Sequence, residues 1–274
     1  MDNLDKLSID IPYFLDISNC LGKFDRFFYF RRNRKLLLDV EKLYDMNDFS
    51  YTLAYSLFSN GYLAYSLYRK YNIPYIVIVQ NTDVNMYFKK VIFLRNMGRE
   101  ILKNASKIVF LSQPYKEFVI NKYVKSSDVS IIQQKSVVIP FGIDDFWFEN
   151  IYFGKKQANN KEIKLLFVGR VNENKNVESI VKASKKLMQK GYRITLTIVG
   201  DIEDKNIGSQ LRQYKFINYI PYVDKRKLLQ IYRQSDIFIM PSIKESFGLV
   251  YAEAMSQGLP VIYTRGQGFD KHFK

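Results

Sequence analysis

The stretch that decides the fold is PSIKESFGLVYAEAMSQGLPVI, residues 241–262. Its Pro-Ser pair ends the apolar run 237–240, and Phe-Gly-Leu opens a helix predicted over 247–257. Gly258 and Pro260 end that helix, and another apolar run follows at once. Strand, helix and strand in this order are typical of one unit of a parallel sheet.

The same alternation extends toward the N-terminus from this stretch. Strands are predicted at 163–168, 194–199, 216–220, 237–240 and 261–263, and helices at 177–188, 209–214, 225–234 and 247–257. Asn176 is placed to cap the first of these helices, and Gly191 to end it. Ligands of parallel sheets bind at the carboxyl ends of the strands. Those ends hold the polar and glycine residues of this half: 169–170, 200–201, 221–222, 242–245 and 264–268.

The first half predicts a second, less regular α/β unit. Its strands are expected at 75–79, 107–111 and 137–139, and its helices at 58–71, at 86–104 and from Pro114. The polar run GKKQANNKE falls within 145–162, which is predicted to be a linker. The fold class is therefore predicted as α/β with two Rossmann-like domains, 1–144 and 163–274.

Composition bounds the chemistry. The chain has 274 residues, and its 47% hydrophobic content is enough for a folded core. A single cysteine, Cys20, excludes an internal disulfide. Together with a single histidine, His272, it also excludes a Cys/His zinc site and leaves His272 as the only histidine that could serve as a general base.

The net charge of +15 favours anionic partners, which include nucleic acid, anionic lipid and phosphorylated ligands. A lysine-rich surface without a binding function would give the same net charge. The chain shows no nucleic-acid recognition motif of the usual kinds, so nucleic acid is not expected as a partner. No signal peptide or membrane-spanning run is visible, which predicts a cytoplasmic protein or one bound peripherally to the inner face of the cell membrane.

Residues 24–35, FDRFFYFRRNRK, mix aromatic and basic side chains. Such a mixture suits a membrane interface, where rings lie at headgroup level and cations meet anionic lipid. It suits equally a surface segment of an α/β domain whose aromatics belong to the core. An anionic membrane surface is therefore one of two interpretations of this segment.

The glutamates of the opening stretch, Glu245 and Glu253, are eight positions apart. On a helix this separation spans about 12 Å, which is of the order of the length of a nucleotide diphosphate. One carboxylate is then placed for the hydroxyls of a sugar and the other for a ribose. The amides of Phe247, Gly248 and Leu249, at the helix start, would face a phosphate. Either glutamate alone is better explained as an ordinary helix acid.

A second string, FVGRVNENKN at 167–176, places Arg170 and Lys175 between a strand and a helix. Two cations at such a point suit a pyrophosphate, whose neutralisation is the main catalytic requirement when a glycosidic bond to diphosphate breaks. By itself the pair is no more than surface charge.

The two strings, in this order and with IVGD at 198–201 between them, resemble the retaining glycosyltransferases of GT-B fold, group 1, also called family 4. The resemblance matches the family's two glutamates to Glu245 and Glu253 and its phosphate-binding cations to Arg170 and Lys175. It implies catalytic roles for Glu245, Arg170 and Lys175. The remaining donor-binding residues that it implies are Gly169, Gly200, Tyr222, Val223, Phe247, Gly248, Leu249 and Glu253, with Tyr222 and Val223 in the loop that contacts the base.

The resemblance also implies the reaction. A sugar would pass from a nucleotide-diphosphate donor, taken to be a UDP-sugar, to a polysaccharide or lipid-linked acceptor with retention of configuration. Neither a metal nor another cofactor is expected, because the two cations take the metal's place.

The first half matches the family more loosely. Asn81 and Asp83, which are predicted as acceptor-side residues, fall where the family often places donor-sugar contacts and polar active-site residues, and the family's usual histidine is absent there. Phe141 replaces an asparagine of the family pattern. The family's Gly-Gly loop is not seen before Phe24, and the chain stops at Lys274, so both domains are expected to be incomplete relative to the family. The alternative interpretation is a truncated, non-catalytic protein that binds nucleotide-sugars or serves in assembly.

Overall fold

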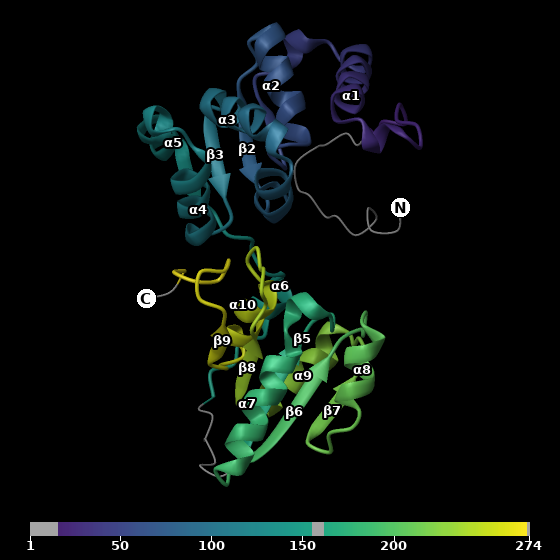
Figure 1. Ribbon diagram of the computed structural model, residues 1–274, viewed down its shortest axis with the longest axis vertical. Coiled ribbons are helices and arrows are strands. Elements are labelled where there is room, and N and C mark those ends of the chain that lie inside the picture. The colour runs from purple at the N-terminus through teal and green to yellow at the C-terminus, as the bar shows by residue number, and fades with distance from the viewer. Residues whose placement is uncertain (1–15, 155–161, 273–274) are drawn as a thin grey trace.

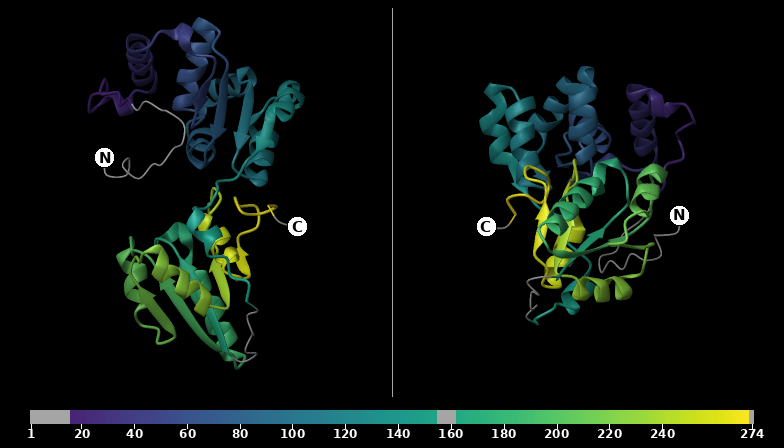
Figure 2. Two further views of the ribbon diagram at one scale, coloured as in Figure 1. Left: turned by 180° about the vertical axis from the view of Figure 1, so that it is seen from behind. Right: turned by 60° about the horizontal axis from the view of Figure 1, so that its bottom comes forward.

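The computed structural model describes residues 16–154 and 162–272. Figure 1 shows two lobes, the first half of the chain above and the second half below. Each lobe is built on a parallel sheet accompanied by helices, which confirms the predicted α/β class and the GT-B type of architecture. The yellow segment that follows the last strand lies at the junction of the lobes in Figures 1 and 2, and there Lys271 pairs with Glu117 at 2.7 Å.

The first lobe holds four parallel strands in the order β1-β2-β3-β4. They are β1 Thr52–Ala54, β2 Tyr75–Val79, β3 Lys107–Phe110 and β4 Ser136–Val138, and the helices are α1 Tyr29–Leu43, α2 Asn60–Tyr71, α3 Arg95–Asn104, α4 Gln113–Tyr123 and α5 Val129–Lys135. Val79 and Phe110 are register partners at the carboxyl ends of β2 and β3, and both are buried. The loops that follow these strands therefore start from a rigid edge.

The long helical stretch expected over 86–104 is present but interrupted. The segment forms a π-helix at Asp83–Phe88, a short 3-10 turn at Ile92–Leu94 and then α3. The side chain of Arg95 stabilises this break, because it donates hydrogen bonds to the backbone carbonyls of Phe88 and Lys89. Such contacts leave no periodic signal in a sequence.

The second lobe holds five parallel strands in the order β7-β6-β5-β8-β9. They are β5 Glu162–Val168, β6 Arg193–Val199, β7 Ile217–Ile220, β8 Ile237–Met240 and β9 Val261–Tyr263, with helices α7 Val177–Gln189, α8 Lys205–Leu211, α9 Lys225–Gln234 and α10 Leu249–Ser256. The chain runs outward from β5 to β7 and then returns to the other side of β5. The strand order therefore reverses between β5 and β8, and such a switch point is where ligands of open α/β sheets bind.

Part of the predicted linker is structured. Residues Asp145–Glu149 form the short helix α6, whose first turn is capped by the Asp144 side chain. Trp147 of this helix is buried in the core of the second lobe, with its ring 5.5 Å from that of Tyr232 in a T-shaped contact. The helix therefore packs with the second lobe, while 155–161 lie outside the described residues.

Asn176 does not cap α7 as predicted. Its backbone is left-handed, with φ of 53°, and its side chain makes no capping hydrogen bond. Its amide instead donates to the carbonyl of Pro241, which ties the start of α7 to the segment after β8. Gly191 ends α7 as predicted, with a φ of +90° that favours glycine.

Candidate functional site

A cavity of about 390 Å³ opens at the switch point between β5 and β8. Its volume lies in the range of small-molecule sites. Seven residues predicted from the sequence line it, namely Gly169, Arg170, Lys175, Glu245, Phe247, Gly248 and Leu249. Phe141, Val168, Met240, Ser246 and Val250 complete the lining. The structure thus gathers residues from both sequence motifs around one space.

Two glycines shape the edge of this cavity. Gly169 follows β5 and Gly200 follows β6, with φ of +152° and +131°. A Cβ atom on Gly200 would lie 2.3 Å from the carbonyl oxygen of Gly169, so no larger residue fits there. Gly200 is not part of the lining; it acts by letting the ends of β5 and β6 approach each other.

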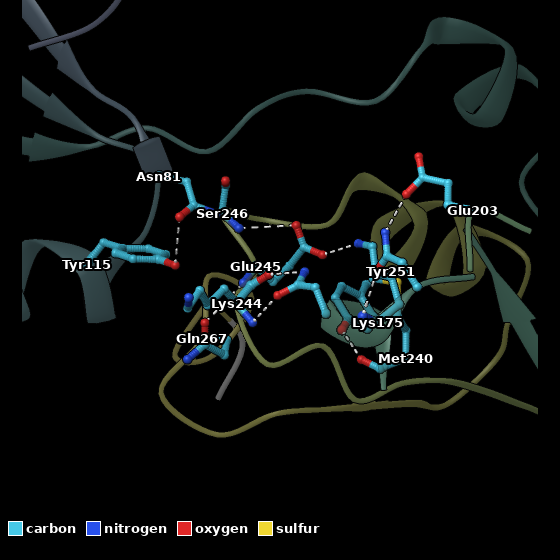
Figure 3. A network of polar contacts seen from close by, with 12 residues as sticks. Asn81, Tyr115, Lys175, Glu203, Met240, Lys244, Glu245, Ser246, Tyr251 and Gln267 are labelled. Carbon is cyan, nitrogen blue, oxygen red and sulfur yellow. Dashed lines mark hydrogen bonds and ion pairs between the residues drawn. The ribbon is translucent and has the colours of Figure 1, made fainter. Parts of the chain in front are cut away.

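An ion pair joins the two motifs inside the cavity wall. The Lys175 ammonium lies 2.6 Å from a carboxylate oxygen of Glu245, and the side chains are only 19% and 14% exposed (Figure 3). The other carboxylate oxygen accepts a hydrogen bond from the N–H of Ser246 at 3.1 Å. The backbone N–H of Glu245 donates to the side chain of Gln267, from the loop after β9. Both members of the pair are therefore fixed in place.

Asn174 holds together the two loops that carry this pair. Its side-chain amide donates to the carbonyl of Lys244 at 3.0 Å, and its side-chain oxygen accepts from the N–H of Lys244 at 3.1 Å. Its backbone carbonyl accepts from the N–H of Ile243. These three hydrogen bonds fix the two loops relative to each other and so set the distance between Lys175 and Glu245. The sequence motifs alone did not indicate this role of Asn174.

Arg170, at the other side of the cavity, pairs with an acid that the sequence analysis missed. Its guanidinium lies 2.8 Å from Glu203, whose second carboxylate oxygen accepts a hydrogen bond from the side chain of Asn172 at 2.7 Å. These contacts hold the pKa of Glu203 below its usual value, the Asn172 hydrogen bond most strongly and the charge of Arg170 next. Arg170 is 70% exposed, so its remaining N–H groups are open to solvent. Glu203 lies just beyond the end of β6, where a polar residue could have been expected.

The start of α10 differs from the prediction. The helix begins at Leu249 rather than at 247, so Glu245 lies in the loop before it, and the helical estimate of its separation from Glu253 does not apply. Gly248 has φ of +81°, and a Cβ atom there would meet the ring of Tyr251. Among the described residues the backbone N–H groups of Phe247, Gly248 and Leu249 have no hydrogen-bond partner, so they are available to an anion in the cavity.

Glu253 lies outside the lining of the cavity. Its carboxylate accepts a hydrogen bond from the hydroxyl of Tyr232 at 3.2 Å. Burial raises the pKa of Glu253, and that hydrogen bond opposes the shift. Tyr222 and Val223 are not in the lining either: Tyr222 is exposed, and Val223 packs against the core of the second lobe. The predicted ribose and base contacts thus stay predictions.

Asp83 is enclosed within the first lobe, and its acceptor-side role stays a prediction. It is 1% exposed, and its carboxylate accepts hydrogen bonds from the N–H groups of Leu57, Phe58 and Gln80 at 2.8 to 3.0 Å. Burial raises its pKa, while these hydrogen bonds oppose the shift. Its role is to hold the loop after β1 against the π-helix.

Asn81 lies on the first lobe beside Tyr115, a residue of α4 that the sequence analysis missed. The hydroxyl of Tyr115 donates to the side chain of Asn81 at 3.5 Å (Figure 3). It also accepts a hydrogen bond from the side chain of Asn85 at 3.1 Å. Burial raises the pKa of Tyr115, and the negative charge of Glu245 raises it further. The polar groups after β2 and β3 therefore face the loop of Glu245 from the other lobe.

His272 packs against the loop that follows β8. Its ring packs edge-on against Phe247, with centroids 5.0 Å apart. Burial lowers its pKa, and it does not line the cavity. The only histidine of the chain therefore stabilises the loop after β8 rather than reaching into the cavity.

Comparisons with known proteins agree with this geometry. The family model described as glycosyl transferases group 1 matches residues 148–274. The alpha-monoglucosyldiacylglycerol synthase of Acholeplasma laidlawii is 24% identical over 88% of this chain and 62% of its own length. The D-inositol 3-phosphate glycosyltransferase of an Arthrobacter species is 35% identical over 49% of this chain and 35% of its own length. The chain spans about half to two thirds of the length of the relatives that it matches most extensively.

Solved structures agree on the fold. The sucrose-phosphate synthase of Thermosynechococcus elongatus superposes with a TM-score of 0.66 at 18% identity, covering 89% of this chain and 63% of its own. The Anabaena protein HepE, solved in complex with UDP and glucose, gives a TM-score of 0.62 at 16% identity, covering 92% and 67%. Residues 148–274 match the family of group 1 glycosyltransferases, and the two parallel sheets with a cavity at the switch point have the GT-B fold of these solved structures, so the findings support a group 1 glycosyltransferase.

Proposed function

We propose that this protein transfers a sugar from a nucleotide-diphosphate donor, a UDP-sugar, to a glycan or lipid-linked acceptor with retention of configuration. The observation that carries the proposal is the convergence on one cavity of two cations, Arg170 and Lys175, with the free amides of residues 247–249. These groups together suit a diphosphate.

In the proposed reaction the bond between the anomeric carbon and the diphosphate oxygen breaks, and its electron pair stays on the diphosphate. Arg170 and Lys175 stabilise the charge that develops there, so the proposal needs no metal or other cofactor. The acceptor hydroxyl attacks from the same face, and its proton passes to the departing diphosphate. Glu245 holds hydroxyls of the donor sugar. The polar groups of Asn81 and Tyr115 face Glu245 from the acceptor side.

The choice of UDP and of acceptor class draws on relatives. HepE was solved with UDP and glucose, and the name of the Acholeplasma relative denotes a glucosyldiacylglycerol product. A capsular polysaccharide glycosyltransferase of Staphylococcus aureus is 26% identical over 60% of this chain. These names support acceptors in surface glycan or glycolipid assembly.

The test is UDP binding by calorimetry to the wild type and to Arg170→Ala and Glu253→Ala. We expect each substitution to weaken binding, by roughly tenfold for the lost charge of Arg170. Equal affinity in all three proteins contradicts the assigned site. UDP binding without transfer across a panel of acceptors supports instead the alternative of a non-catalytic nucleotide-sugar-binding protein.

Location at an anionic membrane is part of the proposal. No helix among the described residues is long and apolar enough to cross a bilayer. Phe24, Phe27, Phe28 and Phe30 are nevertheless 50 to 73% exposed, so these four rings of the segment 24–35 are not core residues. Arg31 and Arg34 lie beside them and are exposed. Exposed rings with adjacent cations support peripheral binding to anionic lipid.

A further inference from the structure

Two lysines of the first lobe lie against one aromatic ring, and the charge of a third lysine, from the second lobe, acts on one of them. Lys89, just after the π-helix, and Lys122, on α4, place their ammonium groups 5.1 and 5.4 Å from the ring centroid of Phe118. Burial lowers the pKa of Lys89, and the positive charges of Lys244 and Lys122 lower it further. Lys244 belongs to the second lobe, so the cluster draws its charge from both lobes.

Lys89, Lys122 and Lys244 are referred to below as the lysine cluster. In the parts of the chain that the structure describes, none of the three forms an ion pair. The acids nearest in sequence are engaged elsewhere: Glu245 binds Lys175, Glu117 binds Lys271, and Asp83 accepts backbone hydrogen bonds. Like charges held together without a counter-charge are destabilising, and an anion relieves the repulsion.

The cluster lies on the acceptor side of the candidate reaction centre. Lys89 donates a hydrogen bond to the side chain of Asn85 at 2.6 Å, and Asn85 in turn donates to Tyr115. Tyr115 is the residue of the first lobe whose pKa Glu245 raises. Phe118 and Lys122 also border a cavity of about 430 Å³ between α4 and the loop after β9, which is room enough for a sugar-sized ligand. Lys271 and the acids Glu117 and Asp270 line this cavity as well.

We propose that Lys89, Lys122 and Lys244 form a subsite for an anionic group of the acceptor, a phosphate. The subsite is separate from the diphosphate position at Arg170 and Lys175. This inference rests on the proposed function, because it takes the donor to occupy the cavity between β5 and β8. A phosphate can come from a sugar phosphate or from a phospholipid headgroup, and the chemistry of recognition is the same for both.

The experiment measures binding of glucose 6-phosphate, with glucose as the uncharged reference, to protein saturated with UDP. Wild type is compared with Lys89→Gln, Lys122→Gln and Lys244→Gln, and with the charge-retaining Lys89→Arg. The matched control is Lys107→Gln, because Lys107 is an exposed lysine at the amino end of β3, the end opposite the loops of the site. A parallel arm replaces the sugar phosphate by vesicles of phosphatidylglycerol, with phosphatidylcholine vesicles as reference.

We expect each Lys→Gln change in the cluster to weaken binding of the phosphate probe by roughly three- to tenfold, and added salt to weaken it further. Lys89→Arg and Lys107→Gln are expected to stay within twofold of wild type. The arm that shows this pattern identifies the source of the phosphate. Unchanged binding in all three cluster variants, or displacement of UDP by the probe, overturns the proposal.

The two proposals fail in different ways. If the wild type binds UDP and the cluster variants bind the phosphate probe as the wild type does, the subsite is refuted and the donor site stands. If no UDP binding is seen, the binding of the probe is measured without it. A loss of probe binding in the cluster variants then supports an anion site while the proposed glycosyltransferase function fails.

Discussion

The ammonium group of Lys175 lies 2.6 Å from a carboxylate oxygen of Glu245, although 70 residues separate the two in the chain. The pair joins the loop after β5 to the loop after β8 across the switch point of the sheet. A diphosphate carries more negative charge than one carboxylate, so it is expected to draw Lys175 away from Glu245 when a donor binds. Glu245 is then free to accept hydrogen bonds from sugar hydroxyls.

Replacing the two members of this pair is expected to have opposite effects on UDP affinity. Lys175→Gln removes a charge-assisted contact and should weaken UDP binding roughly tenfold. Glu245→Gln releases Lys175 and should leave UDP affinity equal or higher, while transfer falls by roughly a hundredfold because the sugar is no longer held. Calorimetry and a transfer assay measure the two effects.

Lys182→Gln is the control for Lys175, since Lys182 is an exposed lysine on α7. It removes the same charge from the same lobe away from the cavity, and we expect unchanged UDP affinity. Weaker UDP binding in Glu245→Gln than in wild type would contradict the competition between carboxylate and diphosphate.

Asp83→Asn tests whether Asp83 acts in folding or in the reaction. The carboxylate accepts three backbone hydrogen bonds while buried, and an amide can supply only one accepting oxygen. The free energy of unfolding should fall by about 2 kcal/mol, measured by urea denaturation. UDP affinity of the folded variant should equal that of wild type.

The matched substitution Asp48→Asn, at an exposed acid of the same lobe, should change stability by less than about 0.5 kcal/mol. Full stability of Asp83→Asn together with lost transfer would support the acceptor-side role of Asp83.

Gly200→Ala separates a steric effect from a backbone effect at the edge of the donor cavity. The new Cβ atom would lie 2.3 Å from the carbonyl oxygen of Gly169, and φ at this position is +131°. Gly191 also has positive φ, +90°, but has open space around a Cβ atom. Gly191→Ala should therefore lower the free energy of unfolding by about 1 kcal/mol, and Gly200→Ala by about 3 kcal/mol or more. Thermal unfolding of both variants checks this, and equal losses refute the collision.

The sequence predicted best those elements whose limits are local. The bounds of β2, β8, β9 and α9 match the prediction residue for residue. The three strands are short apolar runs that follow Pro74, Asp236 and Pro260, and Asp224 caps the start of α9. The break between the π-helix and α3 escaped prediction because Arg95 fixes it through backbone carbonyls. The helix α6 was not predicted, because it is stabilised by the burial of Trp147 in a core that is formed mainly by residues after 162.

The same division holds for the site. Arg170, Lys175 and Glu245 could be grouped from the sequence because each follows a strand of one parallel sheet. The partner of Arg170 could not, because it depends on how the segments beyond β5 and β6 pair: the bridge between Val171 and Ile202 brings Glu203 alongside. The position of Tyr115 opposite Glu245 depends on how the two lobes face each other, and no local sequence pattern encodes that arrangement.

Glu253 predicts a pH dependence of stability. Burial raises its pKa above the ordinary value of 4.5, so the folded state keeps this proton to higher pH than the unfolded state does. Stability from this group is therefore full below pH 4.5 and is lost as pH rises through the folded pKa. Glu253→Gln removes the ionisation and keeps an oxygen that can accept from Tyr232.

The melting temperature of Glu253→Gln should exceed that of wild type at pH 7, and the difference should vanish below pH 4.5. Glu149→Gln, at an exposed glutamate that ends α6, should show no such crossing. A difference between Glu253→Gln and wild type that stays constant from pH 4 to pH 8 would show that burial does not penalise the charged carboxylate.

The exposed rings of segment 24–35 predict binding to anionic vesicles. The wild type should float with phosphatidylglycerol vesicles and not with phosphatidylcholine vesicles, and added salt should reduce the bound fraction. Phe24→Ser with Phe28→Ser should weaken binding at least tenfold, since burying one phenylalanine contributes about 1.5–3 kcal/mol. Arg31→Glu with Arg34→Glu should weaken it through charge. Phe153→Ser is the control, because Phe153 is even more exposed, at 90%, but lies beyond α6 on the second lobe. Flotation insensitive to salt and to both double variants refutes the surface.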